Sequence, residues 1–217
     1  MGIKERKERE KERRRQQIIV AAKRVFSNKG FNKTTMEDIA KEAELSPGTL
    51  YLYFKNKEEL YASLSLRILQ YMHIRIFHVV GRSELDPLGK LDALKEAMSD
   101  VYDFDPLIII NLIHLQSSEM LKNLSDELIE EITTLSRSCI SAISKVFQEG
   151  MDAGVFMKSN PVALSDIFWS VFSGVVLLES SKKIINTDKD FLKSTTELAF
   201  EIFERGIMAK KYAPLGV

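Results

Sequence analysis

The stretch over residues 35–57, TMEDIAKEAELSPGTLYLYFKNK, predicts two short helices joined by a tight turn. Thr34 and Thr35 can each cap a helix N-terminus, and two acids follow them in the first turn, where the helix dipole favours negative charge. Ser46 and Pro47 start the second helix, since serine is a good N-cap and proline suits the first helical position. About three residues separate the helices, which is the spacing of a helix-turn-helix motif.

The second helix has two different faces. In a helix-turn-helix motif, the start of the second helix enters the major groove of DNA. At about 3.6 residues per turn, Leu50 and either Tyr53 or Phe54 can face inward. Thr49 and Tyr51 face outward, toward base edges and phosphates, and Gly48 leaves the backbone open to a phosphate. The pattern therefore predicts DNA binding; the alternative is that the aromatic residues of this helix only fill a core.

The surrounding residues extend the pattern. Phe26 begins the run FSNKGF, which is followed by TT, IA and EA pairs and then by SPGTLY, YF, NK and EEL. From about Ile18 to Leu60 this pattern resembles the DNA-binding domain of TetR-family transcriptional regulators. The resemblance implies a protein that binds double-stranded DNA, with repression favoured over activation. The family's DNA-contact positions are occupied here by Thr35, Ser46, Pro47, Gly48, Thr49, Tyr51, Tyr53 and Lys57.

One turn position departs from the family pattern. Glu44 stands where members of the family often have glycine. A residue other than glycine at positive φ costs on the order of 1 kcal/mol. The turn therefore either tolerates this strain or has a slightly different geometry.

Charge is distributed unevenly along a chain that is neutral overall, with 31 basic and 31 acidic residues. Basic residues are in excess up to Lys57 and acidic residues in the remainder, so the N-terminal part attracts phosphate. The first fifteen residues, MGIKERKEREKERRR, have two interpretations. They form a solvated extension of the first helix or a disordered tail, or they form an arm whose Arg13, Arg14 and Arg15 reach the minor groove or flanking phosphates.

Composition predicts an all-α fold of about nine helices. The chain has 10 glycines, 5 prolines and no alternating segments joined by hairpin signals. We expect a charged extension over residues 1–13, a helix-turn-helix DNA-binding domain over 14–60, and a C-terminal helical domain over 61–217. The sixth expected helix, at about 106–120, contains isoleucines that alone would favour a strand. The first three helices are expected within 14–54, and the others at about 57–80, 88–102, 106–120, 126–153, 161–182 and from 187 or 188 to 210.

The last two expected helices carry more apolar surface than one internal contact needs. Small residues such as Ser170 and Gly174 would allow a neighbouring helix to approach closely. The resemblance implies that these two helices form a four-helix interface in a homodimer. A twofold dimer in turn implies a pseudo-palindromic operator. The alternative is that both helices belong only to the core of a monomer.

The resemblance also implies a small-molecule effector, which binds among helices four to eight and moves the fourth helix. Asn111 and His114 lie three residues apart in an apolar helix, so they can share a face and orient a ligand. The lining predicts a mainly apolar effector with one or two polar groups, although ordinary core packing is an alternative for each residue. The candidate effector-binding residues are Phe77, Met98, Tyr102, Asn111, His114, Trp169 and Phe172.

Other classes of function lack their sequence signals. The sequence has no catalytic or nucleotide-binding motif, so neither an enzyme nor a cofactor is expected. His73 and His78 lie five residues apart, which does not suit a metal site, and the single Cys139 fits a reducing cytoplasm. We expect no signal peptide and no membrane span. The main alternative is a helix-turn-helix protein that has no effector and is controlled by a protein partner.

Overall fold

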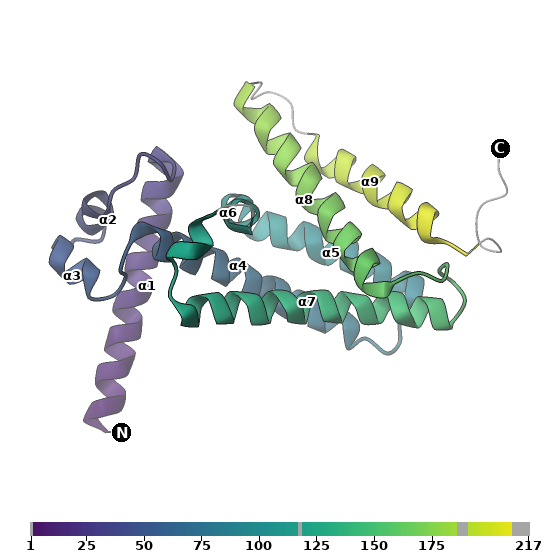
Figure 1. Ribbon diagram of the computed structural model, residues 1–217, viewed down its shortest axis with the longest axis horizontal. Helices are drawn as coiled ribbons and strands as arrows, with labels where there is room; N and C mark the ends of the chain where they lie inside the picture. The colour runs from purple at the N-terminus through teal and green to yellow at the C-terminus, as the bar shows by residue number, and fades with distance from the viewer. Residues whose placement is uncertain (1, 117–118, 186–190, 210–217) are drawn as a thin grey trace. The chain divides into compact units, whose positions relative to one another are not determined.

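The computed structural model describes residues 2–116, 119–185 and 191–209, and over these residues the chain forms nine α-helices and no strand (Figure 1). This agrees with the all-α fold expected from the sequence. The helices are α1 (Ile3–Lys29), α2 (Met36–Glu42), α3 (Pro47–Tyr51), α4 (Lys57–Val80), α5 (Pro87–Phe104), α6 (Pro106–Gln116), α7 (Asp126–Asp152), α8 (Pro161–Ile185) and α9 (Leu192–Ile207), with a 3₁₀ helix at Glu119–Asn123.

The chain divides into two compact units. The first comprises the chain up to Arg67 together with His114–Glu131, and the second comprises Ile68–Ile113 and the chain from Ile132 onward. In the first unit, α1, α2, α3 and the start of α4 surround a small apolar core. Phe26, Phe31 and Tyr61 form an aromatic cluster in it, with ring centroids 4.8–5.8 Å apart. Burial raises the pKa of Tyr61 to about 12.

In the second unit, aromatic residues of α7, α8 and α9 form the centre of the core. The Phe168 ring stacks on that of Phe200, with centroids 4.8 Å apart, and Phe147 packs edge-on against Phe203 at 5.9 Å. In Figure 1, α8 and α9 run side by side. Aromatic stacking across three helices therefore fixes how they pack.

Two close contacts fasten the ends of these helices. Gly150 allows the Phe156 ring to lie on the backbone of α7, because a Cβ at position 150 would lie 2.0 Å from that ring. The end of α9 is tied to the loop between α7 and α8, since the Met157 N–H donates to the Ile207 carbonyl at 2.7 Å. The Ala209 N–H donates to the Val155 carbonyl at 2.9 Å.

Several helix bounds differ from those expected. The first helix begins at Ile3 rather than near residue 14, so the charged run is a helical extension. The sixth helix ends at Gln116 instead of residue 120, although its isoleucines are helical as expected. The ninth helix is described from Leu192, and its expected limits at 187 or 188 and at 210 lie outside the described residues.

The segment Pro161–Lys182 of α8 is long and apolar enough to cross a membrane by length and composition alone. No membrane span is expected from the sequence. Only 28% of its apolar window is buried within the chain, because one side of α8 packs on the core while the other is exposed. The exposed side is therefore open to an interaction outside the chain.

Candidate DNA-contact surface and ligand cavity

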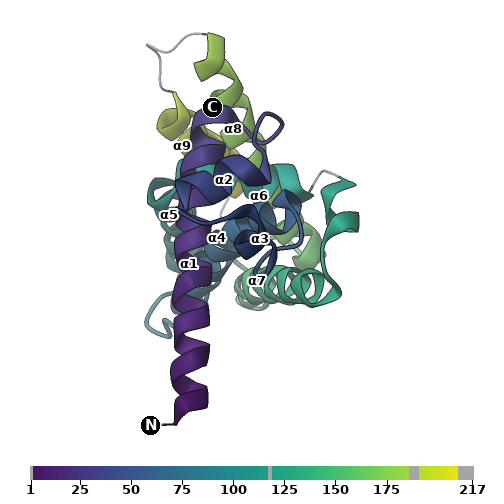
Figure 2. The same ribbon diagram turned by 90° about the vertical axis from the view of Figure 1, so that its left-hand side faces the viewer.

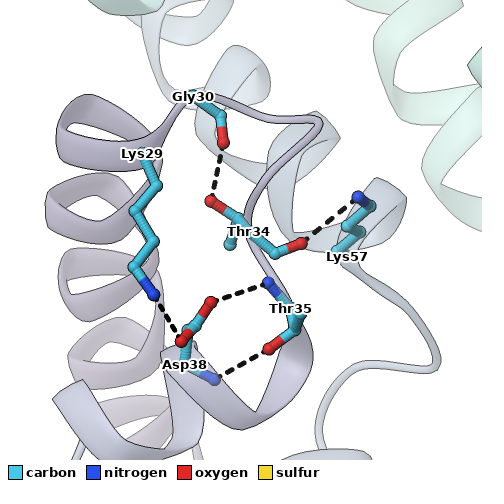
Figure 3. Close-up of polar contacts among 6 residues, drawn as sticks. All are labelled: Lys29, Gly30, Thr34, Thr35, Asp38 and Lys57. Atoms are coloured by element: carbon cyan, nitrogen blue, oxygen red, sulfur yellow. Dashed lines mark hydrogen bonds and ion pairs between the residues drawn. The ribbon is translucent and has the colours of Figure 1, made fainter.

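The start of α2 is held by a reciprocal capping box, shown in Figure 3. The Thr35 hydroxyl accepts the Asp38 N–H at 3.2 Å, and the Asp38 carboxylate accepts the Thr35 N–H at 3.1 Å. Lys29 of α1 donates to the same carboxylate at 2.5 Å. The hydrogen bond from Lys29, followed by the one from the Thr35 backbone, lowers the pKa of Asp38. The predicted cap at Thr35 is therefore present, and it joins α2 to α1.

The turn after α2 keeps the left-handed geometry that glycine usually supplies. Glu44 has a φ of +56°, and it is the one residue other than glycine with positive φ in the described part of the chain. The N–H of Leu45 donates to Ala40 at 2.8 Å and that of Glu44 to Lys41 at 3.1 Å, which is the Schellman pattern of a helix end. The first of the two alternatives therefore holds: the turn tolerates the strain at Glu44.

The start of α3 is fixed by Ser46, as the sequence predicts. Its hydroxyl accepts the Thr49 N–H at 3.1 Å and lies 2.8 Å from the Thr49 hydroxyl. A Cβ placed on Gly48 would have the Ser46 hydroxyl oxygen, at 3.9 Å, as its nearest neighbour, so the backbone there is open. Ser46, Pro47 and Gly48 are all exposed.

The outward surface of α3 differs sharply from its inward surface. Leu50 and Phe54 are buried while Tyr51 is 49% exposed, but α3 ends at Tyr51 instead of Phe54 as expected, so Phe54 follows the helix. Tyr53 is half-buried. Leu52, which the sequence reasoning did not single out, is 79% exposed and directly follows Tyr51 at the end of the helix. Its exposure could have been predicted from the sequence, because it follows the outward-facing Tyr51 and does not belong to the inward-facing residues Leu50 and Phe54.

Lys57 makes contacts within the protein. Its ammonium group donates to the carbonyl oxygens of Phe31 at 3.1 Å and Thr34 at 3.2 Å (Figure 3 shows the second bond). The same group lies 4.5 Å from the centroid of the Phe31 ring. Lys57 therefore ties the start of α4 to the loop before α2. The DNA contact predicted for Lys57 stays a prediction, and these internal contacts give the residue a structural role as well.

The three arginines of the proposed N-terminal arm have different environments. Arg13 pairs with Glu10 at 2.6 Å. Arg15 lies 5.0 Å from the centroid of the Phe54 ring and donates to the Ser63 hydroxyl at 3.2 Å. Arg14 is half-buried beside a groove between α1 and α2. Arg15 thus holds α1 against the segment after α3 and against α4, and contact of the three arginines with DNA stays a prediction.

A cavity of about 290 Å³ lies in the second unit, among α5, α8 and α9. Tyr102 and Phe172, two of the predicted effector-binding residues, line it together. The cavity combines this aromatic wall with polar and charged groups. Its other lining residues are Ser99, Asp103, Leu192, Lys193 and Thr196.

Three other candidates for effector binding, Met98, Phe77 and Trp169, do not line this cavity. Met98 is fully buried, and Phe77 stacks on His73 with ring centroids 4.2 Å apart. Trp169 is adjacent to the cavity wall, 5.8 Å from the Phe172 ring.

Asn111 and His114 do not share one environment. Asn111 is buried in the second unit, whereas His114 is exposed and belongs to the first. Burial therefore changes within one turn of α6, and a joint contact of Asn111 and His114 with a ligand stays a prediction.

Known families and proteins match this arrangement. A family model described as bacterial regulatory proteins, tetR family, matches residues 18–64, and one described as QacR-like protein, C-terminal region, matches residues 89–208. An uncharacterized HTH-type transcriptional regulator, YfiR of Bacillus subtilis, is 28% identical over 179 residues, which cover 76% of this chain and 80% of the relative.

Solved structures share the fold. That of the TetR family transcriptional regulator PfmR from Thermus thermophilus has a TM-score of 0.69 at 19% identity, covering 87% of this chain and 97% of its own. That of the transcriptional regulator FadR from Bacillus subtilis, in complex with stearoyl-CoA, has a TM-score of 0.66 at 22% identity, covering 88% and 98%. With family models matching both its N-terminal and its C-terminal parts, the chain belongs to the TetR family of bacterial transcriptional regulators.

Proposed function

We propose that this regulator is a cytoplasmic repressor, which binds a pseudo-palindromic operator as a homodimer and leaves it when a small, mainly apolar effector binds. The observation that carries the DNA-binding part is the surface of α3. Its start is fixed by Ser46, its inner side is anchored by Leu50 and Phe54, and Tyr51 and Leu52 remain exposed. A helix anchored on one side and exposed on the other suits insertion into a major groove.

The residues of α3 and the residue that follows it can contact different parts of the DNA, because their side chains differ in chemistry. The Tyr51 hydroxyl can donate to a phosphate, which positions the helix on the duplex. Thr49 carries both a hydroxyl and a methyl group for base edges. Leu52 carries only apolar atoms, and the apolar feature of the major groove is the thymine methyl group. We assign Leu52 to a thymine in each half-site.

The DNA-binding proposal is tested by selecting bound duplexes from a random pool with the full chain. A symmetric motif of two half-sites is expected. Tyr51→Ala should then bind the selected duplex more weakly, while Tyr51→Phe separates loss of the hydroxyl from loss of the ring. A pool that gains no symmetric motif would overturn the proposal of a dimeric operator-binding protein.

Leu52 is tested on the same duplex with deoxyuridine in place of individual thymines. Losing one methyl contact should weaken binding about fourfold, the equivalent of roughly 0.8 kcal/mol. Leu52→Ala should be insensitive to the substitution that the unchanged protein detects. If both proteins respond equally at every thymine, Leu52 has another role.

The homodimer proposal rests on the exposed apolar side of α8 and α9. Leu198 is 57% and Ile202 62% exposed on α9, and Ile167 and Leu178 are exposed on α8. A Cβ at Gly174 would have no atom within 4 Å, which leaves room for a helix of a second copy. Burying such side chains is favourable by about 25 cal/mol per Å² of apolar surface.

Light scattering measures this association directly. Ile202→Glu should shift the chain toward monomer, because a carboxylate would be buried without a partner. Met157→Glu, at an exposed apolar residue outside α8 and α9, is the matched control and should leave the mass unchanged. An unchanged mass for both variants would count against α9 as the interface.

The effector proposal rests on the cavity lined by Tyr102 and Phe172. Its volume of about 290 Å³ is suited to a small ligand or to part of a longer one. The aromatic wall favours an apolar body, and Lys193, Asp103 and Thr196 offer contacts to one or two polar groups. The stearoyl-CoA complex of the Bacillus subtilis FadR structure makes acyl compounds a sensible first group of ligands to test.

A thermal-shift screen followed by quenching of Trp169 fluorescence tests the effector. Trp169 is the single tryptophan and lies next to Phe172, so its emission should report ligand in the cavity. A hit should also weaken operator binding. Hits confined to hydrophilic polyanions would contradict the proposed effector class. If no small molecule changes operator affinity, control by a protein partner becomes the better explanation.

A further inference from the structure

The N-terminal half of α1 extends beyond the core of the first unit. Residues from Lys4 to Arg13 are exposed, whereas Ile18 and Ile19 are buried. Figures 1 and 2 show this part of the helix continuing past α3 as a single straight rod. These ten residues are about 15 Å long at about 1.5 Å per residue, which is comparable to the roughly 14 Å along the DNA axis that five successive phosphates of one strand span.

Charges on this extension are sorted by face. At about 100° per residue, four basic residues fall within an arc of roughly 80°, and no acid lies in that arc. We call these residues the basic stripe: Lys4, Lys7, Lys11 and Arg14. Three acids gather on a separate arc: Glu5, Glu8 and Glu12. A merely solubilising helix would intermix the two signs along every face.

The lysines of the basic stripe are available to a partner. Over the described residues, neither an ion pair nor a side-chain hydrogen bond involves Lys4, Lys7 or Lys11. By contrast, Arg13 on the opposite side of α1 pairs with Glu10 at 2.6 Å. The three lysines of the stripe are therefore a row of positive charges on one helix that no acid pairs within the described residues.

The stripe points toward the side of α1 on which α3 lies. Ile18 and Ala22 continue the same arc into the core, and both are fully buried. Arg15, at the edge of this arc, lies over the Phe54 ring just after α3. In Figure 1 the free end of α1 leans toward the side of α2 and α3.

We propose that the basic stripe of α1 binds backbone phosphates of the DNA that flanks each half-site, beyond the bases that α3 contacts. The inference rests on the DNA binding proposed above. Duplex DNA is the occupant favoured by charge and position, because the stripe is positive and continues the surface that presents α3. Phosphate contacts of this kind add affinity without adding sequence specificity.

The test uses the full chain and the selected operator with long or trimmed flanks. The stripe variant is Lys4→Gln, Lys7→Gln and Lys11→Gln together. The matched control removes three positive charges from the opposite side of the same helix: Arg6→Gln, Arg9→Gln and Arg13→Gln. Circular dichroism establishes that both variants keep their helix content.

On long flanks, the stripe variant should bind more weakly than the unchanged protein. The slope of log binding constant against log salt concentration should become less steep by roughly 0.9 for each phosphate contact removed. On trimmed flanks its affinity should equal that of the unchanged protein. The control should lose much less on long flanks. Equal losses in both variants, or a loss that does not depend on flank length, would overturn the proposal. Failure of the unchanged protein to bind any operator would instead reject the proposed function.

Discussion

Each of the two units of the chain is stabilised internally by a different kind of interaction. In the first, α2 and α3 have 7 and 5 residues, which is too short for a helix to persist alone, and side-chain caps and Lys57 hold them in place. In the second, long helices pack through aromatic rings. The candidate DNA-contact surface therefore depends on individual polar contacts, whereas the candidate ligand cavity depends on the packing of a whole core.

The largest effect is expected from breaking the packing of the second unit with Gly150→Ala. The new methyl group would lie 2.0 Å from the Phe156 ring, so the ring or α7 must move. We expect a loss of about 1–3 kcal/mol in the free energy of unfolding. Thermal unfolding followed by circular dichroism measures it.

Gly206→Ala is the control for this change, because it adds the same methyl group to a helix where no atom lies within 4 Å. It should be neutral or stabilise by up to about 1 kcal/mol. Similar destabilisation by both substitutions would mean that helix backbone effects, not the contact with Phe156, dominate at Gly150.

The next effect tests whether one polar contact holds the first unit. Lys57→Ala removes two charge-assisted hydrogen bonds to backbone carbonyls and the contact with the Phe31 ring. We expect a loss of about 1–2 kcal/mol of stability as well as weaker operator binding. Urea unfolding gives the first quantity and a binding titration gives the second.

Lys55→Ala is the matched control, since its side chain is exposed two residues earlier. Its stability should stay close to that of the unchanged protein. If Lys57→Ala unfolds at the same urea concentration as Lys55→Ala, the internal contacts of Lys57 contribute no stability, and DNA contact alone explains the residue.

A smaller effect, of opposite sign, is expected at the turn before α3. Glu44→Gly relieves the positive φ of +56° and should stabilise the first unit by up to about 1 kcal/mol. Glu37→Gly, within α2, should instead destabilise by about that amount. Equal signs for the two substitutions in urea unfolding would argue that strain at Glu44 is negligible.

The smallest effect concerns Cys139, which is buried in the second unit. Burial raises the pKa of its thiol to about 12, from the 9.0 of a free thiol. The folded state therefore keeps the proton while the unfolded state loses it, so this group's contribution to stability declines as the pH rises from 9.0 toward about 12.

Alkylation by iodoacetamide at pH 8.5 should accordingly be slow in the folded chain and fast in urea. Cys139→Ser should show a shallower decline of stability at alkaline pH. Rapid alkylation of the folded chain would show that the core around α7 opens readily, and would weaken the contrast between the two units.

The sequence predicts most in the places where local chemistry decides the structure. The caps at Thr35 and Ser46 depend on residues three positions away, and α4 has the expected limits because two acids follow its start and Gly81 follows its end. The internal bonds of Lys57 could not be predicted in this way, since they reach back to Phe31.

The cavity could not be predicted from local sequence patterns either. Tyr102, Phe172 and Leu192 come from three different helices, so their meeting depends on packing along the whole second unit. The same limit applies to α6, where the spacing of Asn111 and His114 predicts a shared face but their burial differs. Spacing within a helix describes that helix and not its surroundings.

The hydrogen bonds between the end of α9 and the loop before α8 have a mechanical consequence. Because Met157 and Ala209 close the chain on itself at that end, α8 and α9 are fastened to each other beyond their packed faces. The pair of helices α8 and α9, which is proposed to contact the partner subunit, should therefore move as one rigid unit when a ligand binds. Any adjustment around the cavity would then fall mainly on α5, the wall that is not part of that closed loop.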